Sequence, residues 1–176
     1  MKRMIGTLAL SAARGMVLVG SAMAQTGNAA KATSMGTLLG PAQTQTLLPA
    51  KVYFKGQSAT TQIRNSGGVK FADGAYLLAV LVDTSGYSSE IAQRYQAYLI
   101  TEDPIQVGGK HLAAGIYGVG FIGGNQFVVM DVGAHDLVTV PSQTDAAMKR
   151  PRPLMVTGSN GHYRLYEGRR YIPLEK

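Results

Sequence analysis

The clearest structural signal in the sequence is the run IYGVGFIGGNQFVVMDV at residues 116–132. Two mostly apolar segments, Ile116–Ile122 and Gln126–Val132, flank Gly123-Gly124-Asn125. Glycine and asparagine tolerate the positive φ angles that a tight connection requires. The run therefore predicts two antiparallel strands joined by a three-residue turn.

The same run contains the pattern G-x-G-x-x-G from Gly118 to Gly123. In dinucleotide-binding proteins these glycines allow a helix N-terminus to approach a pyrophosphate. That mechanism requires a helix after the glycines, whereas residues 126–130 have the composition of a strand. We interpret the glycines as small residues of a hairpin strand that a neighbouring side chain covers, and we expect no cofactor.

A second informative stretch, Ala75–Val82, reads AYLLAVLV. Such a run is typical of a strand that is covered on both faces or lies at the centre of a sandwich. Asp73-Gly74, directly before it, predicts a hairpin turn, and Asn65-Ser66-Gly67-Gly68 predicts another turn. We take Ala75–Val82 as the core strand.

The rest of the sequence contains further short runs with strand character. We expect strands at 51–55, 60–64, 69–71, 95–101, 104–107, 136–140 and 154–157. A helical turn or two is expected only within 87–94, and 145–150 predicts a brief helix or a loop. These segments predict an all-β domain, an antiparallel β-sandwich or barrel of about nine to eleven short strands with at most one or two short helices.

The N-terminus has the features of a signal peptide. Lys2-Arg3 precedes a mostly small and apolar stretch over 4–20, and Ala22-Met23-Ala24 supplies the A-x-A cleavage pattern. We predict cleavage before Gln25, with an uncleaved anchor as the alternative. Arg14 interrupts the apolar stretch and argues against a membrane span, which needs about 20 apolar residues.

The predicted organisation has three parts: a signal peptide over 1–24, a flexible leader over 25–49 and a single β domain over 50–176. Export places the mature protein in the periplasm or outside the cell. It also makes nucleic acid an unexpected partner, and we expect no integral membrane span after cleavage.

The 176 residues carry a net charge of +7 and include no cysteine. The lack of cysteine excludes disulfides, thiolate zinc sites and cysteine nucleophiles. Loss of residues 1–24 removes three cations and leaves +4. From Lys149 onward the chain has seven Lys and Arg against two Glu, so the positive charge is concentrated at the C-terminal end.

The segment Gly109-Lys110-His111-Leu112-Ala113-Ala114-Gly115-Ile116-Tyr117 spells G-K-x-L-x-A-G-x-Y. It resembles the hairpin of a family of uncharacterised exported bacterial β-proteins. The resemblance covers about a tenth of the chain, and it implies an all-β sandwich-type domain and an extracytoplasmic location. It implies no activity and no catalytic residues.

One cluster has the residue types of a metal or acid–base site. Asp131, His135 and Asp136 place a histidine beside two carboxylates, a set that can bind a divalent metal or act as a base with an orienting acid. The alternative is a solvated loop in which Asp136 caps a turn. The sequence contains no G-x-S-x-G, H-E-x-x-H or P-loop motif, so no motif favours an enzyme.

The C-terminal hairpin is the more informative candidate. If Glu167-Gly168 forms a two-residue turn, Tyr166 pairs with Arg169 and Arg164 with Tyr171. Tyr163, Leu165 and Ile172 then share the core face, while the four candidate binding residues share the outer face. Those four are Arg164, Tyr166, Arg169 and Tyr171.

A cationic and aromatic face can bind an anionic surface, such as a phosphorylated glycan, a phospholipid head group or an acidic protein patch. The alternative is that arginine and tyrosine stack on each other only for stability. Lys149, Arg150 and Arg152 could extend the face.

Three functional hypotheses follow. The first is an exported non-enzymatic β-domain that binds or scaffolds an anionic component or a protein of the cell envelope. The second is a barrel-like carrier of a small apolar ligand, suggested by Tyr76, Leu78, Val80 and Val82 on one face of the core strand. The third is a metal-assisted hydrolase centred on His135.

Overall fold

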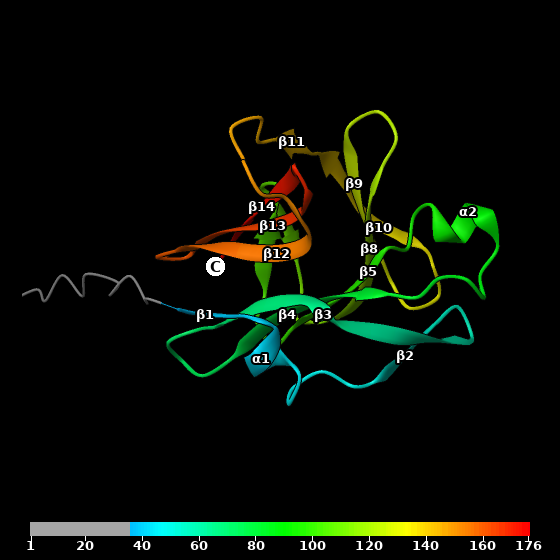
Figure 1. Ribbon diagram of the computed structural model, residues 1–176, viewed down its shortest axis with the longest axis horizontal. Coiled ribbons are helices and arrows are strands. Elements are labelled where there is room, and N and C mark those ends of the chain that lie inside the picture. The colour runs from blue at the N-terminus through cyan, green and yellow to red at the C-terminus, as the bar shows by residue number, and fades with distance from the viewer. Residues whose placement is uncertain (1–35) are drawn as a thin grey trace, which may run out of the picture. The chain divides into compact units, whose positions relative to one another are not determined.

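The computed structural model describes residues 36–176, which form two antiparallel sheets packed face to face (Figure 1). The described part has fourteen strands and two four-residue helices, α1 (Pro41–Thr44) and α2 (Ser89–Ala92). The prediction of an all-β sandwich with at most two short helices is therefore confirmed. The structure has more strands than the nine to eleven expected, because several edge strands are only two or three residues long.

The larger sheet has eight strands in the order β1-β3-β4-β5-β8-β9-β10, with β2 on the N-terminal part of β3. Their bounds are β1 (Thr37–Leu39), β2 (Lys51–Phe54), β3 (Gln57–Lys70), β4 (Tyr76–Val82), β5 (Ala97–Thr101), β8 (Gly115–Ile122), β9 (Gln126–Met130) and β10 (Asp136–Pro141).

The smaller sheet has six strands in the order β12-β13-β14-β6-β7, with β11 on β14. Their bounds are β6 (Ile105–Val107), β7 (Lys110–Leu112), β11 (Gln143–Thr144), β12 (Arg152–Ser159), β13 (His162–Gly168) and β14 (Arg170–Glu175). In Figure 1, β12, β13 and β14 form the layer above β1, β3 and β4.

The main core lies between the two sheets. The larger sheet contributes alternate residues of its central strands, and the smaller sheet contributes the inward residues of β12, β13 and β14. Representative members are Leu77, Ala79, Leu99, Val119, Leu154, Leu165 and Ile172.

A second core lies on the opposite face of the larger sheet. Leu78 and Val80 of β4 face this side and pack against the segments that cover it, which are β2 and the region around α2. Phe54 of β2 and Tyr95 are both fully buried there, and their rings stack with centroids 4.0 Å apart. The larger sheet is thus covered on both faces, as the AYLLAVLV run predicted.

The glycines of the G-x-G-x-x-G stretch serve this second core. A Cβ atom at Gly118 would lie 2.2 Å from a ring carbon of Phe54, and one at Gly120 would lie 2.2 Å from the carbonyl oxygen of Arg94. The glycines therefore let the covering segments approach the sheet. Strand β9 follows after the turn, as expected, and Asn125 in that turn has φ +54°.

The turn predicted at Asn65–Gly68 is wrong. These residues lie inside β3, which runs through them with an irregular register between Gln62 and Ser66. The glycines are needed for close approach, because a Cβ at Gly68 would lie 2.4 Å from the carbonyl oxygen of Leu77. The Asp73-Gly74 turn is confirmed, with Gly74 at φ +97° between β3 and β4.

Part of the predicted leader belongs to the domain. Strand β1 pairs with the C-terminal part of β3, and α1 follows it. Thr44 of α1 is fully buried, and its hydroxyl lies 2.6 Å from that of Ser66. The ordered domain therefore begins before Ala50, while the predicted signal peptide and its cleavage site lie outside the described residues.

Candidate functional site

The C-terminal hairpin forms with a different register from the predicted one. Gly168, at φ +62°, and Arg169 connect the strands, so Glu167 pairs with Arg170 and Tyr166 pairs with Tyr171. The predicted pairing is wrong by two residues. A shift of two leaves the paired side chains on their predicted faces, because side chains alternate with period two along a strand, but it moves Arg169 from the outer face into the turn.

The face of the smaller sheet that points away from the main core is called the outer face below. Tyr163, Leu165 and Ile172 belong to the core, so the residues that alternate with them point outward. Across the strands, the outer face carries Gln143, Met155, Thr157, Ser159, His162, Arg164, Tyr166, Tyr171, Pro173 and Glu175. Three of the four predicted binding residues, Arg164, Tyr166 and Tyr171, are brought together here.

An open groove of about 590 Å³ lies over the outer face. Arg164 and Tyr171 line it, together with the polar residues Gln143, Thr157 and Asn160. Glu175 also lines it, and its carboxylate lies 3.7 Å from Nδ1 of His162. The groove lies at the end of the sheet near the turn between β12 and β13, and its lining extends across β14 to Gln143 of β11.

Arg164 is held in place by the two tyrosines. Its guanidinium carbon lies 4.8 Å from the centre of the Tyr171 ring, and its Nη1 donates to the Tyr166 hydroxyl at 3.4 Å. The hydrogen bond with Tyr166 and the neighbouring phenol groups raise the pKa of Arg164. Among the described residues Arg164 forms no ion pair.

The two tyrosines have different exposure. Tyr166 is 3% exposed, and its hydroxyl donates to Asp145 at 3.3 Å. Tyr171 is partly exposed and donates to the Oε1 atom of Gln143 at 2.5 Å. Tyr166 therefore supports the site from below, while Arg164, Tyr171 and Gln143 are available to a ligand.

The remaining arginines of the hairpin do not join the outer face. Arg169 lies in the turn and donates from Nε to the carbonyl oxygen of Met148 at 3.2 Å. Arg170 lies on the core side, where it pairs with Glu167 at 3.0 Å and its guanidinium carbon lies 5.2 Å from the centre of the Phe121 ring. Burial raises the pKa of Glu167 despite the opposing charge of Arg170.

The candidate metal cluster is divided by the structure. His135 Nδ1 lies 2.9 Å from Asp131 Oδ2, whereas Asp136 forms an ion pair with Arg94. Asp131 also accepts the backbone N–H groups of Gly133 and His135. The hydrogen bonds with His135 lower the pKa of Asp131. Residues 36–176 contain no group of three or more His, Asp or Glu placed to hold a metal ion.

The carrier hypothesis requires an interior cavity. The pocket between the sheets near Leu81, Phe121 and Leu165 encloses about 10 Å³, whereas ligand cavities span about 300–1,000 Å³. The face formed by Leu78, Val80 and Val82 is filled by the second core. These two places therefore offer no room for an apolar ligand.

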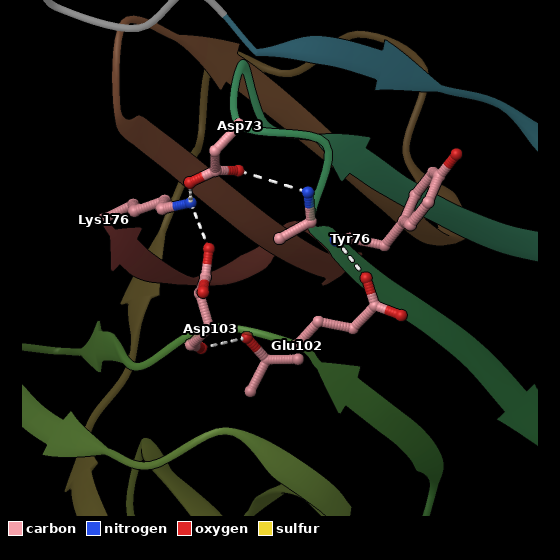
Figure 2. A network of polar contacts seen from close by, with 7 residues as sticks. Asp73, Tyr76, Glu102, Asp103 and Lys176 are labelled. Carbon is pink, nitrogen blue, oxygen red and sulfur yellow. Dashed lines mark hydrogen bonds and ion pairs between the residues drawn. The ribbon is translucent and has the colours of Figure 1, made fainter.

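A charged cluster on another side of the domain is structural. Lys176 contacts the carboxylates of Asp73 and Asp103 (Figure 2). Its ammonium also lies 4.2 Å from the centre of the Phe71 ring. Lys176 follows β14 of the smaller sheet, whereas Asp73 and Asp103 lie in loops that adjoin the larger sheet. We call this cluster the Lys176 clasp because it joins the two layers.

Both charge types in the clasp have shifted pKa values. The hydrogen bond from Lys176, followed by the backbone N–H of Ala75, lowers the pKa of Asp73. Burial acts to lower the pKa of Lys176, but the hydrogen bonds to Asp103 and Asp73 outweigh it and raise that pKa. One ammonium is shared between two carboxylates, and the side chain of Asp73 is 55% exposed, so the clasp keeps a net negative charge at the surface.

Comparisons with models of protein families, with curated proteins and with solved structures find no match. Within residues 36–176, no helix is long and apolar enough to cross a membrane.

Sequence reasoning missed several residues of the groove. Gln143, Thr157 and His162 line it but carry no motif. Leu154 and Val156 alternate as core residues of a strand, so this pattern could have placed Thr157 on the outer face. Thr157 pairs there with Arg164 of β13. No local signal predicts that β11 pairs with β14 and so brings Gln143 to Tyr171.

Proposed function

We propose that this chain is an exported, non-enzymatic binding module that docks an acidic glycan of the cell envelope on the outer face of its smaller sheet. The observation that carries the proposal is the position of Arg164, which lines the 590 Å³ groove, stacks on Tyr171 and has no carboxylate partner among the described residues.

The chemistry of the groove supports an acidic sugar polymer. A guanidinium forms charge-assisted hydrogen bonds with carboxylate or phosphate groups. Gln143, Thr157 and Asn160 supply donors and acceptors of the kind that hydroxyl groups pair with. An anionic lipid surface would call for several protruding cations, whereas Arg164 is the one arginine or lysine that lines this groove.

Export rests on the sequence. The charged start, the apolar stretch and the A-x-A pattern before Gln25 support it, as does the resemblance of Gly109–Tyr117 to exported β-proteins. Sequencing of the N-terminus of the protein recovered from the native cell envelope should start at Gln25. A start at Met1 would contradict export with cleavage.

Binding can be tested by calorimetric titration with an oligogalacturonate, a carboxylated probe, and with a neutral oligosaccharide of the same length. We expect the acidic probe to bind and the Arg164→Gln variant to bind it about tenfold more weakly. Added salt should weaken binding, since the groove and the cation are open to solvent.

The matched control is Lys51→Gln, which removes the same charge from an exposed position on β2. It should bind like the wild type. Equal binding by Arg164→Gln and wild type, or equal binding of the neutral sugar, would contradict the proposal. Binding to vesicles of anionic phospholipid but not to the sugar would assign the site to a lipid surface instead.

A further inference from the structure

Two sheet edges face each other at one side of the sandwich. Among residues 36–176, β1 is an edge of the larger sheet that pairs with β3 alone, and β12 is an edge of the smaller sheet that pairs with β13 alone. The two strands lie side by side in Figure 1, in blue and orange. Within residues 36–176, no backbone hydrogen bond joins them.

A groove of about 430 Å³ separates these edges and is called the edge groove below. Its floor is the irregular part of β3, where Gly67 allows β12 to approach closely: a Cβ at Gly67 would lie 3.0 Å from the backbone nitrogen of Val156. Its walls include Leu38, which is 43% exposed, and Met155, which is partly exposed. The edge groove therefore combines apolar wall residues with polar ones such as Asn65 and Ser66, and it is bordered by strand backbones.

The charges of the edge groove have one sign. Arg64 on β3 and Arg152 at the start of β12 line it, and no carboxylate does. Neither arginine forms an ion pair with a described residue. An occupant that complements the groove has backbone groups for the strand edges, apolar side chains for the walls and carboxylates for the two arginines.

The chain's own N-terminal segment does not have this chemistry. Residues 1–35 contain no aspartate and no glutamate, and they carry four Lys and Arg. Charge complementarity therefore points to a different protein as the source of the occupant.

We propose that the edge groove binds an extended, acidic segment of a partner protein, which adds a strand beside β12 or β1. Main-chain hydrogen bonds then provide affinity, and alternate side chains provide specificity through the apolar walls and the two arginines. This site is separate from the outer-face groove, and it does not depend on the proposed glycan binding.

A fluorescent decapeptide of alternating valine and glutamate is a suitable probe, measured by anisotropy with the full domain. We expect binding that the double variant Arg64→Gln/Arg152→Gln weakens at least tenfold. Replacing the glutamates of the peptide by lysine should abolish binding. Arg164→Gln is the matched control, and it should leave peptide binding unchanged.

A second form of the peptide separates strand addition from simple charge attraction. N-methylation of alternate amides keeps every side chain and charge but removes donors that a strand needs, so we expect it to abolish binding. Equal affinity for the methylated peptide would overturn the proposal.

Loss of peptide binding in Arg164→Gln but not in the double variant would overturn the proposal and assign the peptide to the outer face. Displacement of the peptide by an anionic amphiphile such as decanoate would overturn it and assign the groove to a lipid. Self-association of the domain that depends on Arg64 and Arg152, while the peptide fails to bind, would overturn it and assign the groove to a second copy of this chain.

Discussion

The two sheets of this domain differ in what covers them. The larger sheet has the main core on one face and a second core, built on Phe54 and Tyr95, on the other. The smaller sheet has the main core on one face and an open, polar outer face with a groove on the other. The comparison indicates that the larger sheet supplies stability, whereas the smaller sheet has a surface free for recognition.

Glycines show where the backbone is closely packed, and Gly158 of the smaller sheet is one such position, with a Cβ that would lie 2.2 Å from the His162 carbonyl oxygen. Three glycines of the larger sheet lack space for a side chain, because a Cβ there would lie too close to a neighbouring backbone or ring atom. They are Gly68, Gly118 and Gly120. Gly168 of the smaller sheet has nothing within 4 Å of a Cβ position and serves a turn with φ +62°. The following variants test the comparison, and the largest expected effect comes first.

Phe54→Ala tests whether the second core is part of one cooperative unit. Phe54 is fully buried against Tyr95, so its truncation should lower the free energy of unfolding by about 3–5 kcal/mol in urea titrations. Tyr53, its neighbour on β2, is 69% exposed, and Tyr53→Ala should change stability by no more than about 0.5 kcal/mol. If Phe54→Ala lowered the free energy of unfolding by less than about 1 kcal/mol, the segments that cover the larger sheet, β2 and the region around α2, would fold independently of it.

Gly120→Ala tests the space argument. The added Cβ would lie 2.2 Å from the Arg94 carbonyl oxygen, so the backbone must shift, at a cost of about 2–3 kcal/mol. Gly123 belongs to the same G-x-G-x-x-G stretch but has nothing within 4 Å, and Gly123→Ala should stay within about 0.5 kcal/mol of wild type. If thermal unfolding showed an equal loss of stability in Gly120→Ala and Gly123→Ala, the close contact at Gly120 would not be the reason for the glycine.

Lys176→Met tests the clasp between the sheets through its pH dependence. Because Asp73 has a folded-state pKa below its ordinary 3.8, the clasp stabilises above about pH 4, and that stabilisation disappears as pH falls through the lowered pKa. Because the folded-state pKa of Lys176 is raised above its ordinary 10.5, the contribution of its ammonium is fully present below pH 10.5 and is lost as pH rises through the raised pKa.

The expected loss of Tm in Lys176→Met is smaller than for the two core variants and should be present at pH 7 but shrink below pH 4. Lys51→Met, an exposed position without an ion pair among the described residues, should show no such pH dependence. A loss of the same size at pH 3 and pH 7 would assign the stabilisation to packing on Phe71.

Arg164→Gln should have the smallest effect on stability. The side chain lies on the open outer face, so the Tm of the variant should match that of the wild type in the same scan, while binding of an acidic sugar is weakened about tenfold, as described above. Arg170→Gln is the contrast, because it leaves Glu167 without its partner on the core side and should lower Tm. Similar decreases in Tm for Arg164→Gln and Arg170→Gln would show that Arg164 stabilises the fold.

The sequence contained enough information for the fold class and for the faces of the paired residues in the C-terminal hairpin, but Arg169, expected on the outer face, lies in the turn. Alternation places Tyr163 and Leu165 inside and Arg164 and Tyr166 outside whatever the register. The position of the turn could not be predicted from the sequence, because Glu167-Gly168 and Gly168-Arg169 are both acceptable local turns. Contacts outside the turn, such as that of Arg169 with Met148, favour the second.

The other errors have the same origin in long-range contacts. Gly67-Gly68 has the composition of a turn, but β4 and β12 press against it and require small residues in a strand. Asp136 is near His135 in sequence, yet Arg94, from a distant segment, takes its carboxylate. The edge groove was not predicted because β1 and β12 are far apart in the sequence.

Strand β3 connects the features compared above, since its first residues pair with β2 and its last residues pair with β1. Amide hydrogen exchange along this one strand can therefore follow two separate opening events. Exchange at the Ala59 amide reports detachment of β2 from β3, and exchange at the Lys70 amide, which faces β1, reports opening of the edge beside the groove. A partner strand bound in the edge groove would slow exchange at the second position and leave the first unchanged, so the two kinds of local motion in this domain can be timed independently.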